Sequence, residues 1–394
     1  MQASCRFVLT ILTLCLCACA TRPGPTTVRF ATFNAAMGLQ TAGDLQSRLQ
    51  SGDDPALMAL AAILQRTRPD VVLLNEFDHQ QGFDNAAALI ANYLKHSQHG
   101  DAVIDYPWAY QATVNTGVNS LLDLDKNGIT GEPGDAWGYG VFPGQYGMLV
   151  LSRYPIEYDQ VRSFRLFRWR DMPGALKPRQ ADGAAFYSPR AWRVLRLSSK
   201  NHLDLPLSLN GSTVHFLVSH PTPPVFDGPE DRNGRRNHDE IRLWADYVSG
   251  SGDYLLDDSG VRGGLQIGAR FVIAGDQNSD PLDGDSLERS ISRLLDNQHV
   301  NASCLPASSG GAEAARLQGG VNARHRGNPA LDTSDFSDRT TGNLRLDYVL
   351  PSRNLETVQC GVFWPAAGEP GHDLIQHSDH RLVWLDVRLP AGAN

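Results

Sequence analysis

Short apolar runs alternate with helical patterns along most of the chain, which predicts a mixed α/β fold. The strand-like runs lie at residues 28–33, 71–74, 148–151, 192–197, 214–219, 271–274, 345–350 and 382–387. Apolar residues recur at helical spacing at 55–65, 86–95, 241–248 and 286–295, the third of these opened by a capping-box-like Asn237 and Glu240. No repeat of fixed period breaks this pattern, so one large domain over residues 28–390 is expected.

Long segments rich in Gly, Pro and Asp separate these elements. They lie at 113–145, 170–190, 221–236 and 305–340. Loops of this length are usually functional or disordered. We expect the stretch 305–340, which is rich in Gly, Ala, Ser, Asn and Arg, to be the most mobile of them.

Residues 1–20 form a separate unit. Arg6 precedes an apolar run at 7–14 that fits the h-region of a signal peptide and is too short to span a bilayer. Residues 18–20 offer a small-residue cleavage point, and 16–19 resemble a lipobox in which Cys19 would be lipidated, with Cys17 as an uncommon member. Residues 21–27 form a linker. We expect an exported protein that is periplasmic, secreted or attached to the outer membrane through Cys19.

Cysteine usage and net charge bear on the cellular compartment and on the class of binding partner. Four of the six cysteines lie in the leader, and only Cys304 and Cys360 lie in the body. In an oxidising compartment this pair favours one disulfide, with two buried free thiols as the alternative. The net charge is −8, and it becomes −9 without Arg6. This acidity argues against tight non-specific nucleic-acid binding but does not exclude a nuclease, because bound cations supply positive charge locally.

Polar side chains stand at the ends of most of the predicted strands, and one of them, Asp347, lies inside the predicted strand 345–350. They are Asn34, Glu76, His220, Asp276, Asn278, Asp347, Asp379 and His380. Any one of them alone is more simply explained as a turn residue or a satisfied structural group. Strand ends of a sheet can converge on one cleft, however, so the whole set predicts a multi-carboxylate site. Carboxylate and amide oxygens without cysteine favour Mg²⁺ or Mn²⁺, and such a metal beside histidines suits phosphoryl chemistry.

Taken in chain order, these motifs resemble the endonuclease/exonuclease/phosphatase superfamily. The matching set is Thr32-Phe33-Asn34, Leu74-Asn75-Glu76, the run 146–152, Ser219-His220, Gly275-Asp276-Gln277-Asn278, Leu346-Asp347-Tyr348 and Ser378-Asp379-His380. The resemblance spans 28–388 and implies a four-layer α/β sandwich with two central mixed sheets that hydrolyses phosphoester bonds with Mg²⁺ or Mn²⁺. Gln277 is a departure, since the family usually has Phe or Leu there.

The resemblance also implies how the acidic residues act. Glu76, aided by Asn34, would be the principal metal ligand, and Asp379 would bind or influence a metal. Asp276 and Asn278 would orient the attacking water and the phosphate.

The histidines take their roles from the same resemblance. His380 would be the catalytic histidine, with Asp347 fixing its tautomer, and His220 would be the second histidine. Tyr146, at the start of the matching run 146–152, is a candidate contact to the substrate phosphate.

Residues 123–135, DLDKNGITGEPGD, resemble a calcium loop. Asp123, Asp125 and Asn127 stand at its first, third and fifth places, but Gly134 occupies the twelfth place, where an acid is usual. The sequence is compatible both with a structural Ca²⁺ site and with a solvated Asp/Gly turn.

Residues 229–242 present three arginines shortly after His220. Arg232, Arg235 and Arg236 could clamp a substrate phosphate, assisted by the N-terminus of a helix that starts near Asn237. The alternative is a solvated basic loop, because neighbouring acids offset much of the charge.

The motifs leave the substrate open among nucleic acid, lipid and small-molecule phosphoesters, and between monoesters and diesters. We predict an exported, divalent-metal-dependent phosphoesterase. An endonuclease acting on extracellular DNA or RNA is one alternative. A calcium-dependent surface binding protein without catalysis is another, and it would be expected to lose Glu76, Asp276 or His380. The sequence indicates no obligate protein partner.

Overall fold

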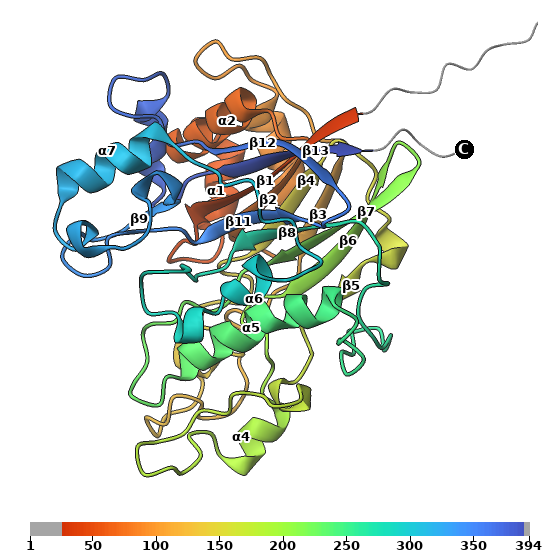
Figure 1. The fold of residues 1–394 in the computed structure, drawn as a ribbon, viewed down its shortest axis with the longest axis vertical. Helices are drawn as coiled ribbons and strands as arrows, with labels where there is room; N and C mark the ends of the chain where they lie inside the picture. Colours follow the sequence, from red (N-terminus) through yellow and green to blue (C-terminus); the bar gives the residue numbers. More distant parts are fainter. Residues whose placement is uncertain (1–25, 390–394) are drawn as a thin grey trace, which may run out of the picture.

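A computed structural model of the chain describes residues 26–389, so the predicted leader and Cys19 lie outside the described residues. Two β-sheets pack face to face, and helices cover their outer faces (Figure 1). This four-layer α/β sandwich is the predicted fold. Among residues 26–389, no helix has the length and apolar character needed to cross a membrane.

Both large sheets are mixed. Their strand orders are β12-β13-β1-β2-β4-β3 and β11-β8-β7-β6-β5, and β9 and β10 form a small separate pair. β1 runs parallel to β2 and β7 runs parallel to β8, whereas the other neighbours in the two sheets are antiparallel. The strands are β1 (Thr26–Met37), β2 (Val71–Phe77), β3 (Trp108–Ala112), β4 (Met148–Ser152), β5 (Arg162–Ser163), β6 (His202–Leu209), β7 (Ser212–Ser219), β8 (Phe271–Asp276), β9 (Ser334–Asp335), β10 (Asn343–Leu344), β11 (Asp347–Pro351), β12 (Glu356–Val362) and β13 (Val383–Leu389).

The helices are short, apart from α2 and α5. They are α1 (Asp44–Ser51), α2 (Pro55–Thr67), α3 (Asn85–Leu89), α4 (Pro189–Val194), α5 (Arg232–Val248), α6 (Ser292–Leu295) and α7 (Ser309–Gln318). α3 continues directly into a π-helical turn at Ile90–Leu94, and together they fill the helix predicted at 86–95.

Alternation along β1 explains why its sequence is apolar on both faces. Phe30 points into the core between the sheets, where its ring lies 5.5 Å from that of Phe216 on β7. Ala31 and Phe33 point the other way, into the core beneath α1, α2 and α3. Because both faces of the strand are buried, the strand reads as a nearly continuous apolar run.

One predicted strand is wrong. Residues 192–197 alternate polar and apolar side chains, but α4 occupies the first half of this stretch. The Ser188 side chain accepts the N–H of Ala191 at 3.1 Å, and Pro189 takes the first helical position. Local capping therefore outweighs the alternation.

The start predicted for α5 is also wrong. The helix begins at Arg232, and Asn237 lies inside it as a fully buried residue. The Asn237 amide donates to the carbonyls of Thr222 and Gln277, both at 2.9 Å. This residue therefore ties the helix to the loops that follow β7 and β8 and does not cap it.

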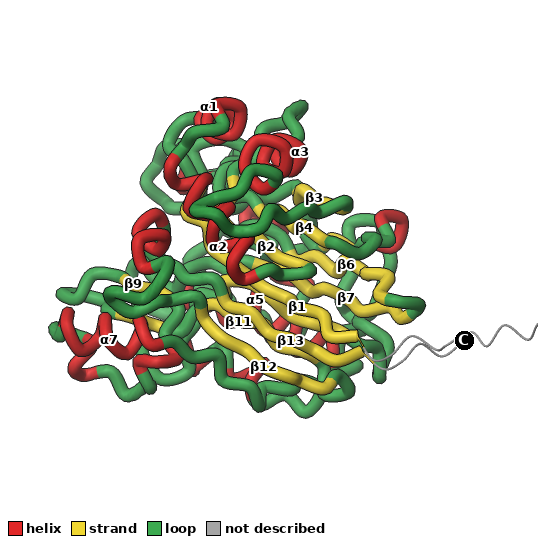
Figure 2. Tube along the Cα trace, turned by 90° about the horizontal axis from the view of Figure 1, so that it is seen from above, coloured by secondary structure: helices red, strands yellow, loops and turns green. Residues whose placement is uncertain are grey.

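The stretch 305–340 is not the featureless loop that its composition predicts. It forms α7, β9 and several single turns, and Figure 2 shows α7 and β9 together at one end of the molecule. Cys304 and Cys360 form the disulfide favoured by the sequence, which ties the start of this excursion to β12. The stretch 305–340 is thus a structured excursion, and it reaches the candidate site.

Candidate active site

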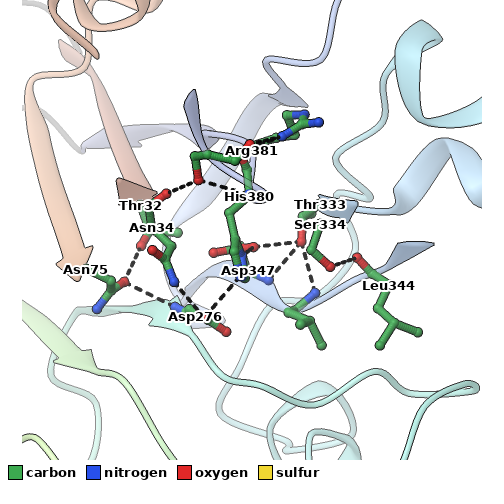
Figure 3. A network of polar contacts seen from close by, with 12 residues as sticks. Thr32, Asn34, Asn75, Asp276, Thr333, Ser334, Leu344, Asp347, His380 and Arg381 are labelled. Carbon is green, nitrogen blue, oxygen red and sulfur yellow. Dashed lines mark hydrogen bonds and ion pairs between the residues drawn. The ribbon is translucent and has the colours of Figure 1, made fainter. Parts of the chain in front are cut away.

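The predicted strand-end residues converge because the strands end at the same edge of each sheet. Parallel pairing of β1 and β2 places Asn34 opposite Asn75, next to Glu76. Antiparallel pairing of β8 and β11 places Asp276 opposite Asp347. His380 lies just before β13, and Figure 3 shows it facing Asp347 and Asp276.

Asp276 is the centre of this arrangement and is almost fully buried. Its Oδ2 accepts the Asn34 amide at 3.1 Å and lies 3.4 Å from His220 Nε2 and 3.6 Å from His380 Nε2. Its Oδ1 accepts the backbone N–H of Asn278 at 2.8 Å. Burial alone would raise the pKa of Asp276. The charges of His380 and His220 and these hydrogen bonds have the larger effect and lower the pKa below its ordinary value, so the group stays ionised.

His380 is held by a second carboxylate. Its Nδ1 donates to Asp347 Oδ2 at 2.8 Å, which leaves Nε2 facing Asp276. Burial lowers the pKa of His380, but the charges of Asp347 and Asp276 outweigh it and raise the pKa to about 10. The imidazole is therefore a cation at neutral pH.

Two residues of the excursion complete this pair, and sequence reasoning missed both. Thr333 donates its hydroxyl to Asp347 Oδ2 at 2.8 Å and accepts the backbone N–H of Asp347 at 3.0 Å. The ring of Phe336 meets the edge of His380 with centroids 5.6 Å apart. No sequence signal marks them, because they lie in the stretch that composition predicts to be mobile.

Four residues at or next to the site have left-handed backbones. Ala36, Glu76, Tyr146 and Asn278 have φ values of 50°, 53°, 53° and 49°. These left-handed conformations are unfavourable for residues with a Cβ and persist only where the surroundings enforce them. Three of these four residues are predicted site residues, so the strain coincides with the residues expected to act.

Lys200 is a further site residue that sequence reasoning missed. It is only 7% exposed, and burial lowers its pKa while the carboxylates of Glu240, Glu76 and Asp276 oppose that shift. Its ammonium makes no hydrogen bond or ion pair to any described residue. Its place in a polar cluster just before β6 could have signalled it, had β6 been predicted.

The residues present fit a divalent cation. The Glu76 carboxylate is partly exposed, and its Oε1 accepts only the Asn34 amide, at 3.1 Å. Asn34 here donates its N–H groups to Glu76 and Asp276, so it orients both carboxylates. The buried Asp347 Oδ1 has no hydrogen-bond partner among the described residues. Such an oxygen-rich donor set suits a hard cation such as Mg²⁺ or Mn²⁺.

Asp379 lies apart from the buried cluster. Its side chain is exposed and lines an open cleft of about 570 Å³ beside Ala36, Asp335 and His377. The cleft adjoins the site, because Ala36 follows Asn34 and Asp379 precedes His380. Asp379 therefore faces the solvent side of the site, where a metal or substrate would enter.

The predicted calcium loop forms a second carboxylate cluster. Asp123 and Asp125 come together with Asp135, which follows the Gly134 at the twelfth place. The Asn127 amide donates to Asp125 and to Glu132, and its oxygen accepts the N–H of Ile129. Calcium binding by this loop stays a prediction.

The three predicted phosphate-clamp arginines engage the protein itself. Arg236 is buried and donates to the backbone carbonyls of Leu197, Trp137 and Arg196. Arg232 pairs with the Glu230 carboxylate, and Arg235 donates to the Glu230 carbonyl. These contacts argue against the clamp, which stays a prediction.

The chain is similar to one protein family and to solved structures of its fold. The sequence model of the Endonuclease/Exonuclease/phosphatase family matches residues 31–380. An endonuclease/exonuclease/phosphatase from Beutenbergia cavernae has a TM-score of 0.51 and 18% identity, covering 92% of this chain and 72% of that chain.

Two further structures are similar at lower scores. A family protein from Leptotrichia buccalis has a TM-score of 0.47 and 13% identity, with 92% and 100% of the two chains covered. Sphingomyelinase C from Streptomyces griseocarneus has a TM-score of 0.42 and 16% identity, with 92% and 99% covered. None of the curated protein sequences matches this chain.

Proposed function

Since the chain belongs to the endonuclease/exonuclease/phosphatase family, we propose that it is a divalent-metal-dependent phosphoesterase that hydrolyses phosphodiester or phosphomonoester bonds. One observation carries this proposal: the ionised Asp276 is held between two histidines while the Asn34 amide links it to Glu76. A structural role alone would not need two imidazoles and three acids at the edge where both sheets end.

The chain's own residues can share the work of hydrolysis. Asp276 and Asn278 are assigned to orienting the attacking water and the phosphate. As the bond from the water oxygen to phosphorus forms and the bond to the leaving oxygen breaks, the proton of the water passes to solvent. The His380 imidazolium supplies positive charge toward the phosphoryl oxygens, where negative charge builds up. Asn278 is held beside Asp276 by its amide, which donates to the Pro221 carbonyl at 3.1 Å.

A bound Mg²⁺ or Mn²⁺ would polarise a phosphoryl oxygen as a Lewis acid. Glu76 is the residue proposed to hold it, with Asn34 orienting the carboxylate and Asp379 contributing from the open cleft. Removing the metal by chelation is therefore expected to abolish turnover while leaving the fold intact.

We further propose that the protein is exported and acts on phosphoesters outside the cytoplasm. Support comes from the signal-like leader, from the lipobox-like residues before Cys19 and from the Cys304–Cys360 disulfide, which suits an oxidising compartment. Lipid attachment through Cys19 is the more specific form of this proposal, and mass spectrometry of the mature N-terminus tests it.

The test of the enzymatic proposal is a substrate panel with Mg²⁺, Mn²⁺, Ca²⁺ or EDTA. The panel holds plasmid DNA, RNA, bis-p-nitrophenyl phosphate, p-nitrophenyl phosphate and sphingomyelin. We expect metal-dependent turnover that falls at least about 1,000-fold in His380→Ala, because the variant loses the cation facing the phosphoryl group. His96→Ala, at an exposed histidine, is the matched control. Turnover of nucleic acid alone would favour the endonuclease, and a folded protein inactive on every substrate would favour the binding protein.

A further inference from the structure

Three strained segments of the site meet at one carboxylate. Ala36, Glu76 and Tyr146 all have left-handed backbones and lie on separate segments: at the register shift near the end of β1, in β2 and before β4. Strain of this kind must be held by the surrounding contacts. Asp78, two residues after Glu76, makes the contacts that join these segments.

Asp78 is 5% exposed and uses both oxygens of its carboxylate. Oδ1 accepts the backbone N–H of Tyr146 at 2.8 Å, and Oδ2 accepts that of Leu39 at 2.8 Å. The Asp78 N–H also approaches the Met37 carbonyl at 3.4 Å. One side chain thus fixes the loop after β1 to the loop before β4.

A buried amide reinforces the same junction. Gln145 is fully buried, and its amide donates to the Leu39 carbonyl at 2.6 Å. Its Oε1 accepts the N–H of Val141, also at 2.6 Å. The residue before Tyr146 is therefore anchored to the same loop that Asp78 grips.

The backbone position of Tyr146 sets where its ring lies. The ring rests on Gly38, where an added Cβ would lie 2.3 Å from Tyr146 Cδ1. The N–H of Phe77, which follows Glu76, donates to the carbonyl of Gly147, which follows Tyr146, at 3.0 Å, so the Tyr146 and Glu76 segments lie side by side. The Tyr146 hydroxyl makes no hydrogen bond to the described residues and is free to meet a ligand.

We propose that Asp78 is a positioning residue, whose two-oxygen grip on Leu39 and Tyr146 fixes the Tyr146 hydroxyl beside Glu76 to bind a phosphoryl oxygen of the substrate. The inference rests on the proposed function. The grip on Leu39 and Tyr146 requires a carboxylate at position 78, because an asparagine offers one acceptor oxygen and turns an NH₂ group toward the second N–H. A side chain that served stability alone would not act through Tyr146.

A double-mutant cycle separates these roles. With bis-p-nitrophenyl phosphate and Mn²⁺, Tyr146→Phe and Asp78→Asn should each lower kcat/KM at least about 10-fold. The kcat/KM of the double variant should lie within about 3-fold of that of the less active single variant, because both changes remove the same contact. A double variant whose loss equals the product of the two single losses overturns the proposal, as does an Asp78→Asn variant with unchanged kcat/KM.

Asp54→Asn is the matched control. Asp54 also accepts two backbone N–H groups, from Ala56 and Leu57 at 3.0 Å each, but it caps α2 away from the site. The Asp54→Asn variant should keep the wild-type kcat/KM. In the Asp54→Asn/Tyr146→Phe double variant, the loss of kcat/KM should be the product of the two single losses.

Two further measurements keep the test decisive. If Asp78→Asn does not fold, Gly38→Ala displaces the Tyr146 ring while leaving Asp78 in place, and it should match Tyr146→Phe; full activity in Gly38→Ala overturns the proposal. Hydrogen exchange of the peptide 139–147 reports the grip without turnover. If the wild type hydrolyses nothing, the proposed function fails, yet faster exchange in Asp78→Asn still supports the grip, and unchanged exchange overturns it.

Discussion

The protein carries two carboxylate clusters that differ in how they are built. The first joins Asp276, Asp347 and His380, and the second joins Asp123, Asp125 and Asp135; in each, ligand atoms lie within 4.8 Å of one another. The first is buried and draws on β8, β11 and the segment before β13. The second lies within a single loop and is partly exposed.

The clusters also differ in how their charge is balanced. In the first, the imidazolium of His380 lies between the carboxylates of Asp276 and Asp347, so a cationic side chain offsets part of their charge. In the second, the three carboxylates contact only backbone N–H groups and one amide, with no cationic side chain paired to them in the described part of the chain. The first cluster thus has part of its negative charge balanced by its own imidazolium, whereas the second has no internal cation and leaves its charge to solvent or a bound ion.

The largest effect is expected when a charge is removed from the first cluster. Asp347→Asn removes the charge that fixes His380 and should lower kcat/KM about 100-fold. Asp204→Asn is the matched control, because Asp204 forms a similar pair with His215 at 2.8 Å on β6 and β7. Kinetics with bis-p-nitrophenyl phosphate decide the outcome. Equal losses in both variants would mean that Asp347 matters only for folding.

The charge balance also predicts how stability depends on pH. The folded pKa of His380, about 10, exceeds its ordinary value of 6.5, so its stabilising contribution is complete below about pH 6.5 and is lost as pH rises toward 10. The unfolding free energies of the wild type and His380→Gln, measured by urea in EDTA, should therefore converge by at least about 1 kcal/mol between pH 6 and pH 10. A constant difference across this range would refute an imidazolium held by two carboxylates.

The smallest expected effect concerns the loop cluster. If the loop binds calcium, saturating Ca²⁺ should raise the Tm of the wild type by at least about 2 °C relative to EGTA, because ligand binding stabilises the folded state. Asp135→Asn should abolish this increase, whereas Asp379→Asn should retain it. A Tm that does not respond to Ca²⁺ would leave the loop as a solvated turn.

The two clusters also mark what the sequence could predict. Asp276, Asp347 and His380 were predictable because each stands next to or inside an apolar run, and apolar runs are visible in a single sequence. Asp135 was not assigned to the loop cluster because the register of a helix-flanked calcium loop does not apply here. A local turn at Pro133–Asp135 instead brings its side chain back toward Asp123 and Asp125.

The missed residues share another cause. Lys200, Thr333 and Phe336 belong to segments without apolar periodicity, and only tertiary packing carries them to the site. β12 was missed for a related reason, since this edge strand is largely exposed and lacks an apolar run. Asn237 shows the opposite error: a polar run reads as a helix boundary although its side chains are buried and paired.

The disulfide makes one wall of the site part of a covalent ring. Cys304 and Cys360 are 56 residues apart, and Thr333, which supports Asp347, lies within the ring they close. Closing a loop of that length removes roughly 4 kcal/mol of chain entropy from the unfolded state. A protease cut inside the ring would leave both pieces joined, and they would separate on a gel only after reduction. Protein made in a reducing cytoplasm would lack this closure, so its specific activity would report its oxidation history.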